Sequence, residues 1–310
     1  MVPRISCQGV AKNFGDFTAL HEVSFDLQAG RILGVLGSNG AGKSTLINML
    51  AGLSVPSAGT VELCGKDPRK PETRKVLGVV QQHLQLPGIL SPRELARYVY
   101  TYFAPADQSK AERDAYCQEF LESWDIGEFI DKQLKNLSGG QQRRVSVALA
   151  FIGSPEIVLL DEPTTGLDPK ARHRMWTAIQ EEARKGTAIL LTSHYLDEVE
   201  YLSDEILLLD RGRRVAHTTK EEFLNTSKAT VVRFSLPDAA AAEAFIAGMD
   251  PALGQWVRDE NTLQISTHRL REILVALLEN TVEFEDFQAR RWNLEEAMEM
   301  RLRDEHQNSD

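Results

Sequence analysis

Apolar runs of strand length alternate with amphipathic stretches along much of the chain. The strand-like runs lie at residues 31–36, 60–63, 76–80, 156–160 and 187–191. Amphipathic patterns with helical spacing lie at residues 141–152 and 169–184, on either side of the run at 156–160. Apolar strands separated by helices predict an α/β fold, with a mostly parallel core sheet and helices on both of its faces.

Two segments of this α/β body follow a different pattern. Residues 4–30 have the pattern of short strands around a turn at residues 13–16, with apolar and polar side chains alternating at 23–27. They predict an N-terminal antiparallel β subdomain. Residues 91–124 have helical spacing that Pro105 interrupts, which predicts a helical insertion over about residues 88–152.

The pattern of strands and helices restarts after residue 227. Strand-like runs at 230–236, 262–266 and 282–288 alternate with helical patterns at 239–248, 269–280 and 294–303. This order predicts a small C-terminal α+β domain of ferredoxin-like type. The chain is therefore expected to divide into residues 1–227 and residues 228–310.

Length and composition are those of a globular protein with more than one domain. The 310 residues exceed the roughly 150 of a typical domain, and 42% are hydrophobic and 26% charged. The net charge of −10 argues against a broad nucleic-acid surface, and we expect no nucleic-acid partner. Three widely spaced cysteines, Cys7, Cys64 and Cys117, indicate a reducing compartment. The apolar runs are all shorter than the roughly 18 residues of a membrane span, so if the protein works at a membrane, another chain is expected to supply the membrane part.

A glycine-rich segment, GSNGAGKST at residues 37–45, lies between an apolar run and a helical pattern. Glycines let successive backbone N–H groups face one concavity, and the start of a helix adds its positive end, so such a segment binds anions. The G-x-x-x-x-G-K-[ST] spacing predicts a phosphate loop for a nucleotide with Mg²⁺. Lys43 is expected to reach the β- and γ-phosphates, and Ser44 to hold Mg²⁺. The predicted nucleotide-binding residues of this loop are Ser38, Asn39, Gly40, Ala41, Gly42, Lys43, Ser44 and Thr45.

Two adjacent carboxylates follow the apolar run at 156–160. Asp161 and Glu162 are thus expected at the carboxyl end of a buried strand, where ligands of open α/β sheets bind. Neighbouring strand residues point in opposite directions, so one carboxylate can serve the metal while the next addresses a water molecule. We assign Asp161 to Mg²⁺ coordination through the water shell, and Glu162 to the role of general base.

A second glycine-rich helix start occurs at residues 137–144, LSGGQQRR. Ser138 is a good N-cap, and the glycines allow backbone amides to approach a ligand closely. One chain therefore offers two helix ends suited to anions but only one set of catalytic carboxylates. This pairing indicates that the second helix end serves a nucleotide held by another copy.

Residues 1 to about 225 resemble the ATP-binding subunits of ABC transporters. The sequence LSGGQ resembles the family signature, which implies nucleotide contacts from Ser138, Gly139, Gly140 and Gln141. Phe14 resembles the aromatic residue that stacks on adenine, and Gln82 resembles the catalytic glutamine near Mg²⁺ and the attacking water. Asp168 resembles a residue of the loop that crosses the dimer interface at the nucleotide, and His194 resembles the switch histidine at the γ-phosphate.

The resemblance implies a P-loop ATPase that dimerises head-to-tail on ATP, either as a homodimer or with a homologous ATPase chain. Hydrolysis would reopen the dimer and drive a separate membrane permease, whose cytoplasmic segment meets the helical insertion. The segments at 153–156 and 291–298 resemble those of the exporter branch. That branch implies export, and a place on the cytoplasmic face of the inner or plasma membrane. Residues 228–310 either belong to the closing domain of that branch or only stabilise a dimer.

Two other functions compete with transport. ABC ATPases that act on ribosomes or DNA usually carry two cassettes or a long coiled coil, whereas this sequence has one phosphate loop, one signature and an acidic balance. A non-hydrolysing regulator would lack catalytic residues that this chain keeps, namely Lys43, Asp161, Glu162 and His194. These motifs do not identify a transported substrate.

Overall fold

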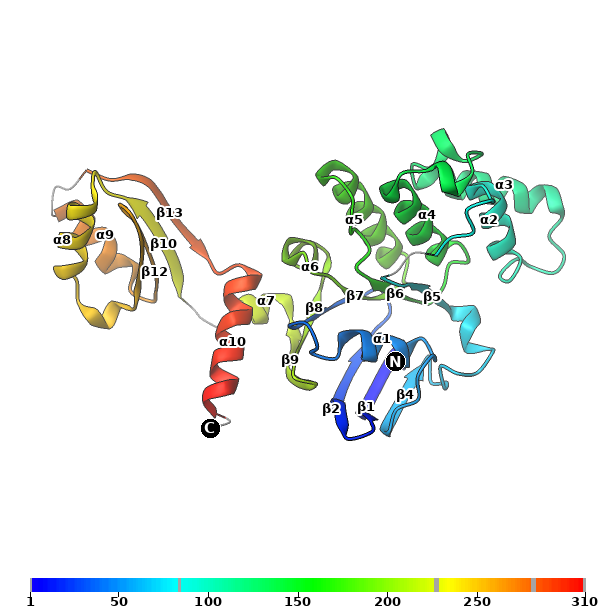
Figure 1. Ribbon diagram of the computed structural model, residues 1–310, viewed down its shortest axis with the longest axis horizontal. Helices are drawn as coiled ribbons and strands as arrows, with labels where there is room; N and C mark the ends of the chain where they lie inside the picture. The colour runs from blue at the N-terminus through cyan, green and yellow to red at the C-terminus, as the bar shows by residue number, and fades with distance from the viewer. Residues whose placement is uncertain (1, 83–84, 226–228, 280–282, 309–310) are drawn as a thin grey trace. The chain divides into compact units, whose positions relative to one another are not determined.

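The chain folds into two compact units, Met1–Lys220 and Glu221–Asp310 (Figure 1). The computed structural model describes residues 2–82, 85–225, 229–279 and 283–308. The boundary predicted between residues 227 and 228 lies outside the described residues, and the units separate earlier, after Lys220.

The described part of the first unit contains a nine-stranded mixed sheet in the order β4-β1-β2-β9-β8-β3-β7-β6-β5. Neighbouring strands among β8, β3, β7, β6 and β5 run parallel, while β4, β1 and β2 pair antiparallel. The strands are β1 (Ile5–Phe14), β2 (Phe17–Leu27), β3 (Ile32–Leu36), β4 (Ala58–Leu63), β5 (Leu77–Val80), β6 (Ile157–Asp161), β7 (Ala188–Thr192), β8 (Glu205–Asp210) and β9 (Arg213–Thr219).

The burial of these strands explains the hydrophobic pattern. All residues of β3 and β7 are buried, and in β6 only Asp161 is partly accessible, so these strands are continuous apolar runs. In β1 and β2, buried side chains are interspersed with accessible ones. These two strands have 10 and 11 residues, so the expectation of short strands was wrong. Strands β8 and β9 were not predicted.

Helices cover both sides of the parallel strands. Buried residues of α1 share a core with β1, β2 and β3, while α4 and α5 lie on the other side of the sheet (Figure 1). The helical insertion holds α2, α3 and α4, and the break at Pro105 falls between α2 and α3. The helices are α1 (Lys43–Leu50), α2 (Pro92–Tyr100), α3 (Lys110–Ser123), α4 (Gly139–Phe151), α5 (Pro169–Arg184) and α6 (Leu196–Leu202), with 3-10 turns at Thr73–Val76, Gly127–Phe129 and Leu134–Asn136.

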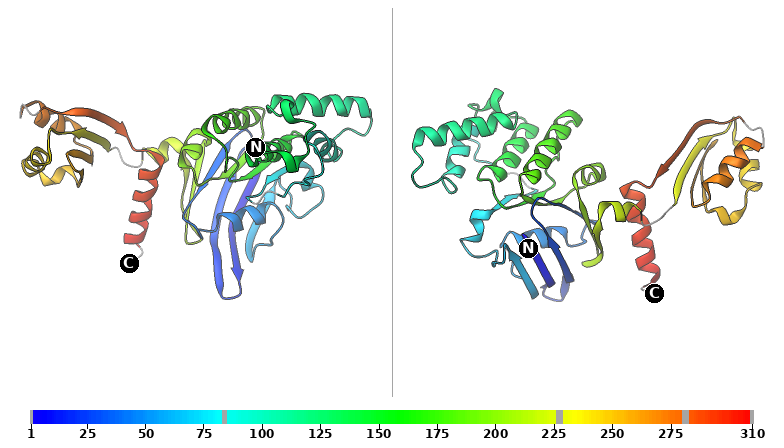
Figure 2. Two further views of the ribbon diagram at one scale, coloured as in Figure 1. Left: turned by 45° about the horizontal axis from the view of Figure 1, so that its top comes forward. Right: turned by 180° about the vertical axis from the view of Figure 1, so that it is seen from behind.

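The second unit contains a four-stranded antiparallel sheet in the order β11-β12-β10-β13. Its β-α-β-β-α-β element order is that of ferredoxin-like domains. Figure 2 shows α8 and α9 on one face of this sheet, and their buried residues share a core with β10 and β12. The elements are α7 (Lys220–Leu224), whose first residue belongs to the first unit, β10 (Thr230–Ser235), α8 (Ala239–Ala247), the 3-10 turn Pro251–Leu253, β11 (Trp256–Asp259), β12 (Thr262–Thr267), α9 (Leu270–Glu279), β13 (Glu285–Arg291) and α10 (Leu294–Asn308).

The elements of the second unit differ in several places from the sequence-based expectation. Strand β11 was not predicted, β13 begins at Glu285 instead of residue 282, and α10 extends beyond residue 303 to Asn308. Across the described residues of both units, no helix has the length and apolar character needed to cross a membrane.

Candidate nucleotide-binding site

The glycine-rich loop joins β3 to α1, and its shape requires glycine. Gly42 has a φ of 101°, and a Cβ there would lie 2.8 Å from the carbonyl oxygen of Ala19 and 2.6 Å from Cδ2 of Leu20. Helix α1 starts directly after Gly42, which has no side chain to cap the first N–H groups. The helix therefore presents an uncapped positive end at this loop, as an anion-binding helix start requires.

Lys43 is held against the loop that carries it. Its Nζ donates hydrogen bonds to the carbonyl oxygens of Gly37 at 2.7 Å and Ser38 at 2.9 Å. Burial lowers the pKa of Lys43, while the nearby carboxylates of Glu162 and Asp161 oppose that shift. The loop thus holds a partly desolvated cation next to two acidic groups.

Asp161 and Glu162 face the same hollow, which the alternation of a strand did not predict. Strand β6 ends at Asp161, and Glu162 has a φ of 53°, in the left-handed region that favours glycine. The Glu162 N–H donates to the carbonyl oxygen of Thr192 at 3.0 Å. Thr192 Oγ1 donates to Asp161 Oδ1 at 2.5 Å, so β7 supports both acidic residues.

The Glu162 carboxylate connects the remaining predicted catalytic residues. Its Oε1 accepts from Gln82 Nε2 at 2.9 Å and lies 2.6 Å from His194 Nε2. Its Oε2 accepts from Thr165 Oγ1 at 3.2 Å. Gln82 follows β5 and His194 follows β7, so the fold brings two distant segments to one carboxylate.

A hollow of about 290 Å³ collects these groups. Ser38 and Ala41 belong to the loop but do not line this hollow, and Phe14 does not line it either. Phe14 is 55% exposed, with Lys12 Nζ 5.0 Å from its ring centre. Phe17, which sequence reasoning missed, does line the hollow; its signal was a second aromatic residue just after the turn. The lining residues are Phe17, Ala19, Asn39, Gly40, Gly42, Lys43, Ser44, Thr45, Gln82, Asp161, Glu162, Thr192, Ser193 and His194.

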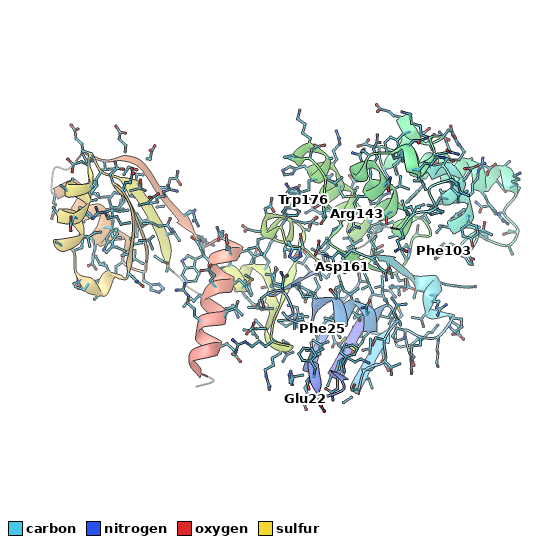
Figure 3. The ribbon with its side chains drawn as sticks, viewed as in Figure 1. Glu22, Phe25, Phe103, Arg143, Asp161 and Trp176 are labelled. Atoms are coloured by element: carbon cyan, nitrogen blue, oxygen red, sulfur yellow. The ribbon has the colours of Figure 1, made fainter. Side chains whose placement is uncertain are left out.

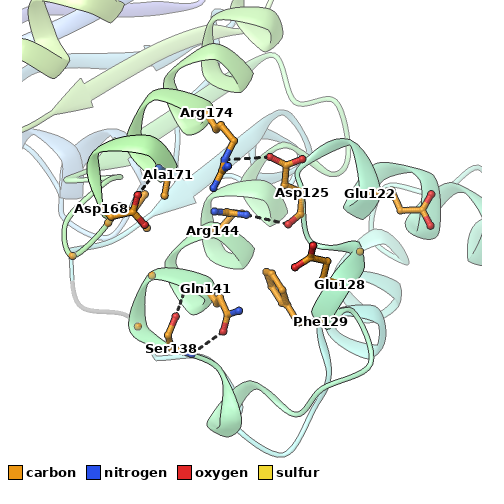
Figure 4. A pocket seen from close by; sticks show the side chains of 15 residues that line it. Glu122, Asp125, Glu128, Phe129, Ser138, Gln141, Arg144, Asp168, Ala171 and Arg174 are labelled. Atoms are coloured by element: carbon orange, nitrogen blue, oxygen red, sulfur yellow. Dashed lines mark hydrogen bonds and ion pairs between the residues drawn. The ribbon is translucent and has the colours of Figure 1, made fainter.

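The signature residues line a separate hollow of about 1010 Å³ (Figure 4). Ser138 caps α4 as predicted: Gln141 N donates to Ser138 Oγ at 3.2 Å, and Ser138 N donates to Gln141 Oε1 at 3.0 Å. Asp168 caps α5 by accepting from Ala171 N at 2.9 Å, a hydrogen bond that lowers the pKa of Asp168.

Two arginines that sequence reasoning did not single out face this second hollow. Arg144 donates to the carbonyl oxygen of Asp125 at 3.0 Å, and Arg174 Nε lies 3.6 Å from Asp125 Oδ2 (Figure 4). Arg144 belongs to the predicted motif segment, whereas Arg174 is one of several charged residues of α5 and had no distinctive local signal. Within one chain the two predicted nucleotide-contacting sets therefore line different hollows.

Comparison with known proteins decides the family. A model of the ABC transporter family matches residues 20–165, and one described as an AAA domain, putative AbiEii toxin, Type IV TA system, matches residues 133–198. The chain is 37% identical over 228 residues to the Nod factor export ATP-binding protein I of Cupriavidus metallidurans, covering 73% of this chain and 74% of that protein. The chain belongs to the ABC transporter family.

Two further matches extend this result. The ABC ATPase is 34% identical over 301 residues to the daunorubicin resistance ATP-binding protein DrrA3 of Streptomyces coeruleorubidus, with 94% of each chain covered. The structure of an ATP-binding subunit of an ABC transporter matches with a TM-score of 0.65 and 27% identity, over 72% of this chain and 92% of that one.

A dimeric ATP-binding cassette in a post-hydrolysis state with ADP and phosphate matches with a TM-score of 0.63 and 25% identity, over 69% of this chain and 98% of that one. The fold and function predicted from sequence are thereby confirmed: the chain is an ATP-binding ABC subunit that hydrolyses ATP.

Proposed function

We propose that this ABC ATPase closes head-to-tail with a second ATPase chain over ATP and energises export through a separate membrane permease. The names of its relatives support export, since one is a Nod factor export protein and another a daunorubicin resistance protein. The match to the resistance protein spans nearly the whole of both chains, so it includes the second unit as well as the ATPase unit.

The loop around Lys43 and the carboxylate of Glu162 line one hollow, whereas the signature around Ser138 lines another. A complete site needs both sets around one nucleotide, and a head-to-tail pair of chains supplies them. The dimeric cassette structures among the matches support this arrangement.

The donor set in the first hollow fits Mg²⁺. Ser44 offers a hydroxyl, Gln82 an amide oxygen and Asp161 a carboxylate, which are the hard oxygen ligands that Mg²⁺ takes together with water and substrate phosphates. We assign these three side chains to the ion, with Asp161 acting through a water molecule. When bound, Mg²⁺ supplies positive charge next to the β- and γ-phosphates.

The side chains around the three proposed Mg²⁺ ligands are assigned to phosphate binding, proton transfer and adenine binding. Lys43 binds phosphate oxygens, and Glu162 takes a proton from the attacking water. Gln82 and His194 already contact the Glu162 carboxylate, so they hold it in place, and His194 is also assigned to the γ-phosphate. Adenine is assigned to the aromatic residues at the β1–β2 turn, with Phe14 as the residue that the family resemblance indicates and Phe17 as the one that lines the hollow.

The permease is assigned to a hollow of about 450 Å³ beside the glutamine segment. It lies between the helical insertion and the core, where the resemblance places the cytoplasmic segment of a permease. This contact would hold the ATPase at the cytoplasmic face of the inner or plasma membrane. The hollow is lined by Ala51, Leu53, Val79, Gln81, Gln85, Leu86 and Ser146.

A mixture of two defective chains tests the between-chain site. One chain carries Lys43→Ala and the other Ser138→Arg, and both also carry Glu162→Gln so that bound ATP is trapped rather than hydrolysed. In a mixed dimer, one site combines both lesions, while the other joins the intact loop of the Ser138→Arg chain to the intact signature of the Lys43→Ala chain. We expect trapped nucleotide in the mixture and none with either chain alone.

Failure of the mixed dimers to trap nucleotide would point to sites formed within one chain. If each chain used its own signature, both sites of the mixed dimer would carry a lesion, and no nucleotide would be trapped. Absence of trapping in confirmed mixed dimers would therefore reject the between-chain assignment.

The permease contact is tested with Leu53→Asp. This change should prevent co-purification with the membrane partner while leaving nucleotide trapping intact. Retained co-purification would show that the permease binds elsewhere on the chain.

A further inference from the structure

Arg143 is a charged residue of α4 that is only 4% exposed (Figure 3). Arginine is almost never buried to this extent unless its charge and donors are satisfied. Its donors are satisfied by main-chain oxygens from two other segments. The acceptors are the carbonyl oxygens of Gln81 at 2.8 Å, Gln82 at 3.4 Å, Asp161 at 2.5 Å, Pro163 at 3.1 Å and Glu162.

The geometry of a guanidinium suits this set of acceptors. Nη1 donates to the segment that carries Gln82, while Nε and Nη2 donate to the turn that carries Glu162. A planar fork with five N–H donors can span two segments at once, whereas a lysine ammonium donates from a single atom. Arg143 thus links the glutamine segment and the catalytic turn by one rigid group.

The turn at Glu162 is also the part of the site with an uncommon backbone. Glu162 has a φ of 53°, and such a conformation persists in a residue other than glycine when its surroundings hold it. Three consecutive carbonyl oxygens, from residues 161 to 163, converge on Arg143. The cation favours this convergence of carbonyl dipoles, and so favours the turn that aims the Glu162 side chain into the hollow.

We propose that Arg143 is a positioning residue for ATP hydrolysis: from the signature helix, it fixes the main chain of Gln82 and Glu162, and so the place of their side chains. Arg143 donates no hydrogen bond to the side chains of Gln82 or Glu162. It acts on both through main-chain carbonyl oxygens. This inference rests on the proposed role of Glu162 as general base.

The test compares Arg143→Met, Arg143→Lys and a control in the full chain. Methionine removes all five donors, and lysine keeps the charge but not the fork. A 1 Å displacement of a catalytic group can cost about a hundredfold, so we expect kcat of the Met variant to fall at least about tenfold. The Lys variant should recover only part of this loss. The Kd for ATP, measured by equilibrium titration, should change by less than about threefold, because the phosphate loop is untouched.

Phe151→Leu is the matched control. Phe151 lies on the same helix, is 1% exposed and packs on Trp124, but it does not contact the catalytic turn through hydrogen bonds. This variant should lower the melting temperature and leave kcat per folded molecule close to that of the parent. A kcat loss of equal size in Phe151→Leu would assign Arg143 a structural role only and overturn the proposal.

A cycle with Glu162→Gln separates the two proposals. If Arg143 acts through Glu162, Arg143→Met should slow hydrolysis much less in the Glu162→Gln chain than in the parent. Normal turnover of Glu162→Gln alone would remove the general-base role. If Glu162→Gln hydrolyses ATP slowly but both Arg143 variants keep the kcat of the parent, only the positioning role of Arg143 would be overturned. If the Met variant is insoluble, the Lys variant decides; insolubility of both would also count against positioning, because it would make Arg143 part of the fold.

Discussion

The two glycine-rich helix starts of this chain differ in how their N-termini are satisfied. Helix α1 begins after Gly42, which offers no capping side chain, whereas α4 begins with Ser138 and Gln141 in a reciprocal capping box. The first helix end is therefore open to phosphate within its own chain. The second is already capped by its own side chains. Similar glycine-rich sequences thus predict related ligands, but they do not show whether the N–H groups of the helix start are free to bind them.

The charges around the two helix starts differ as well. Lys43, Asp161 and Glu162 line the first hollow, while the second is lined by Arg144 and Arg174 together with four acidic residues, Glu122, Asp125, Glu128 and Asp168. A hydrolytic site needs acidic groups for the metal and the water, and these occur in the first hollow. The acidic residues of the second hollow lie apart from the phosphate loop, so its contribution to a nucleotide comes from the glycine-rich start of α4. Neither hollow therefore holds a complete site by itself.

The largest effect is expected from removing the general base of the first hollow. Glu162→Gln keeps the shape of the side chain but cannot accept the proton of water, so hydrolysis should fall at least about a hundredfold while ATP binding is retained. Phosphate release at saturating ATP measures this. Glu156→Gln is the control, because Glu156 precedes β6 at its opposite end and pairs with Arg4. Near-normal turnover of Glu162→Gln would rule out Glu162 as the base.

The next largest effect is expected in the ATP affinity of dilute, monomeric protein, where changes in the two hollows can be compared directly. Lys43→Ala removes a charge-assisted hydrogen bond worth about 1.5–3 kcal/mol, so nucleotide affinity should fall by about ten- to a hundredfold. Ser138→Arg should leave this affinity nearly unchanged, because Ser138 lines the other hollow. Equilibrium titration with ATP, with sedimentation to confirm the monomer, measures both. Equal weakening by the two changes would show that one chain uses its own signature.

A smaller effect distinguishes the two aromatic residues at the edge of the first hollow. Stacking of a base on an aromatic ring is worth about 1–3 kcal/mol, so loss of the stacking residue should weaken ATP binding by about tenfold. The lining of the hollow favours Phe17→Ala as the damaging change, whereas the family resemblance favours Phe14→Ala. Titrating ATP and inorganic triphosphate in parallel isolates the adenine contribution. No difference between the ligands in either variant would remove both residues from adenine binding.

The smallest expected effect concerns the second unit. All residues that line the two hollows precede Lys220, so a chain ending there should fold and bind ATP with an affinity within about twofold of the full chain. Lys220 itself is anchored to the first unit, since its Nζ donates to the carbonyl oxygen of Glu200 at 2.6 Å. Thermal unfolding and ATP titration check both points. An insoluble fragment, or one that has lost binding, would make residues 221–310 integral to the ATPase unit.

Much of the fold could be predicted because central strands are continuous apolar runs. Strands β3, β6 and β7 are buried on both faces, which local sequence shows directly. Strand β9 has one buried residue, Ala216, and its pairing with β8 depends on tertiary contacts that its own pattern does not reveal. Strand β8, by contrast, has a clear apolar run at residues 206–209, a signal that could have been used.

The phosphate loop was predictable because its chemistry is local in sequence. The family resemblance assigned Gln82 and His194 to the same nucleotide site. Their contacts with the Glu162 carboxylate were not predicted, since neither residue has a local signal for them. The role assigned to Arg143 could not be predicted, because its acceptors include carbonyls 18 and 62 residues away in sequence. The left-handed backbone of Glu162 had no local signal either. The roles of these residues in hydrolysis stay predictions until the variants are measured.

Lys43 is not a loose charge. Its hydrogen bonds to the carbonyl oxygens of Gly37 and Ser38 tie the ammonium to the curve of the phosphate loop. Phosphate therefore arrives by exchange, in which charged oxygens replace carbonyl oxygens on an ammonium that is already placed. The entropy of ordering the loop is lost during folding and not again at each binding event. A protein that must take up and release nucleotide in every cycle thus begins each cycle from the same geometry.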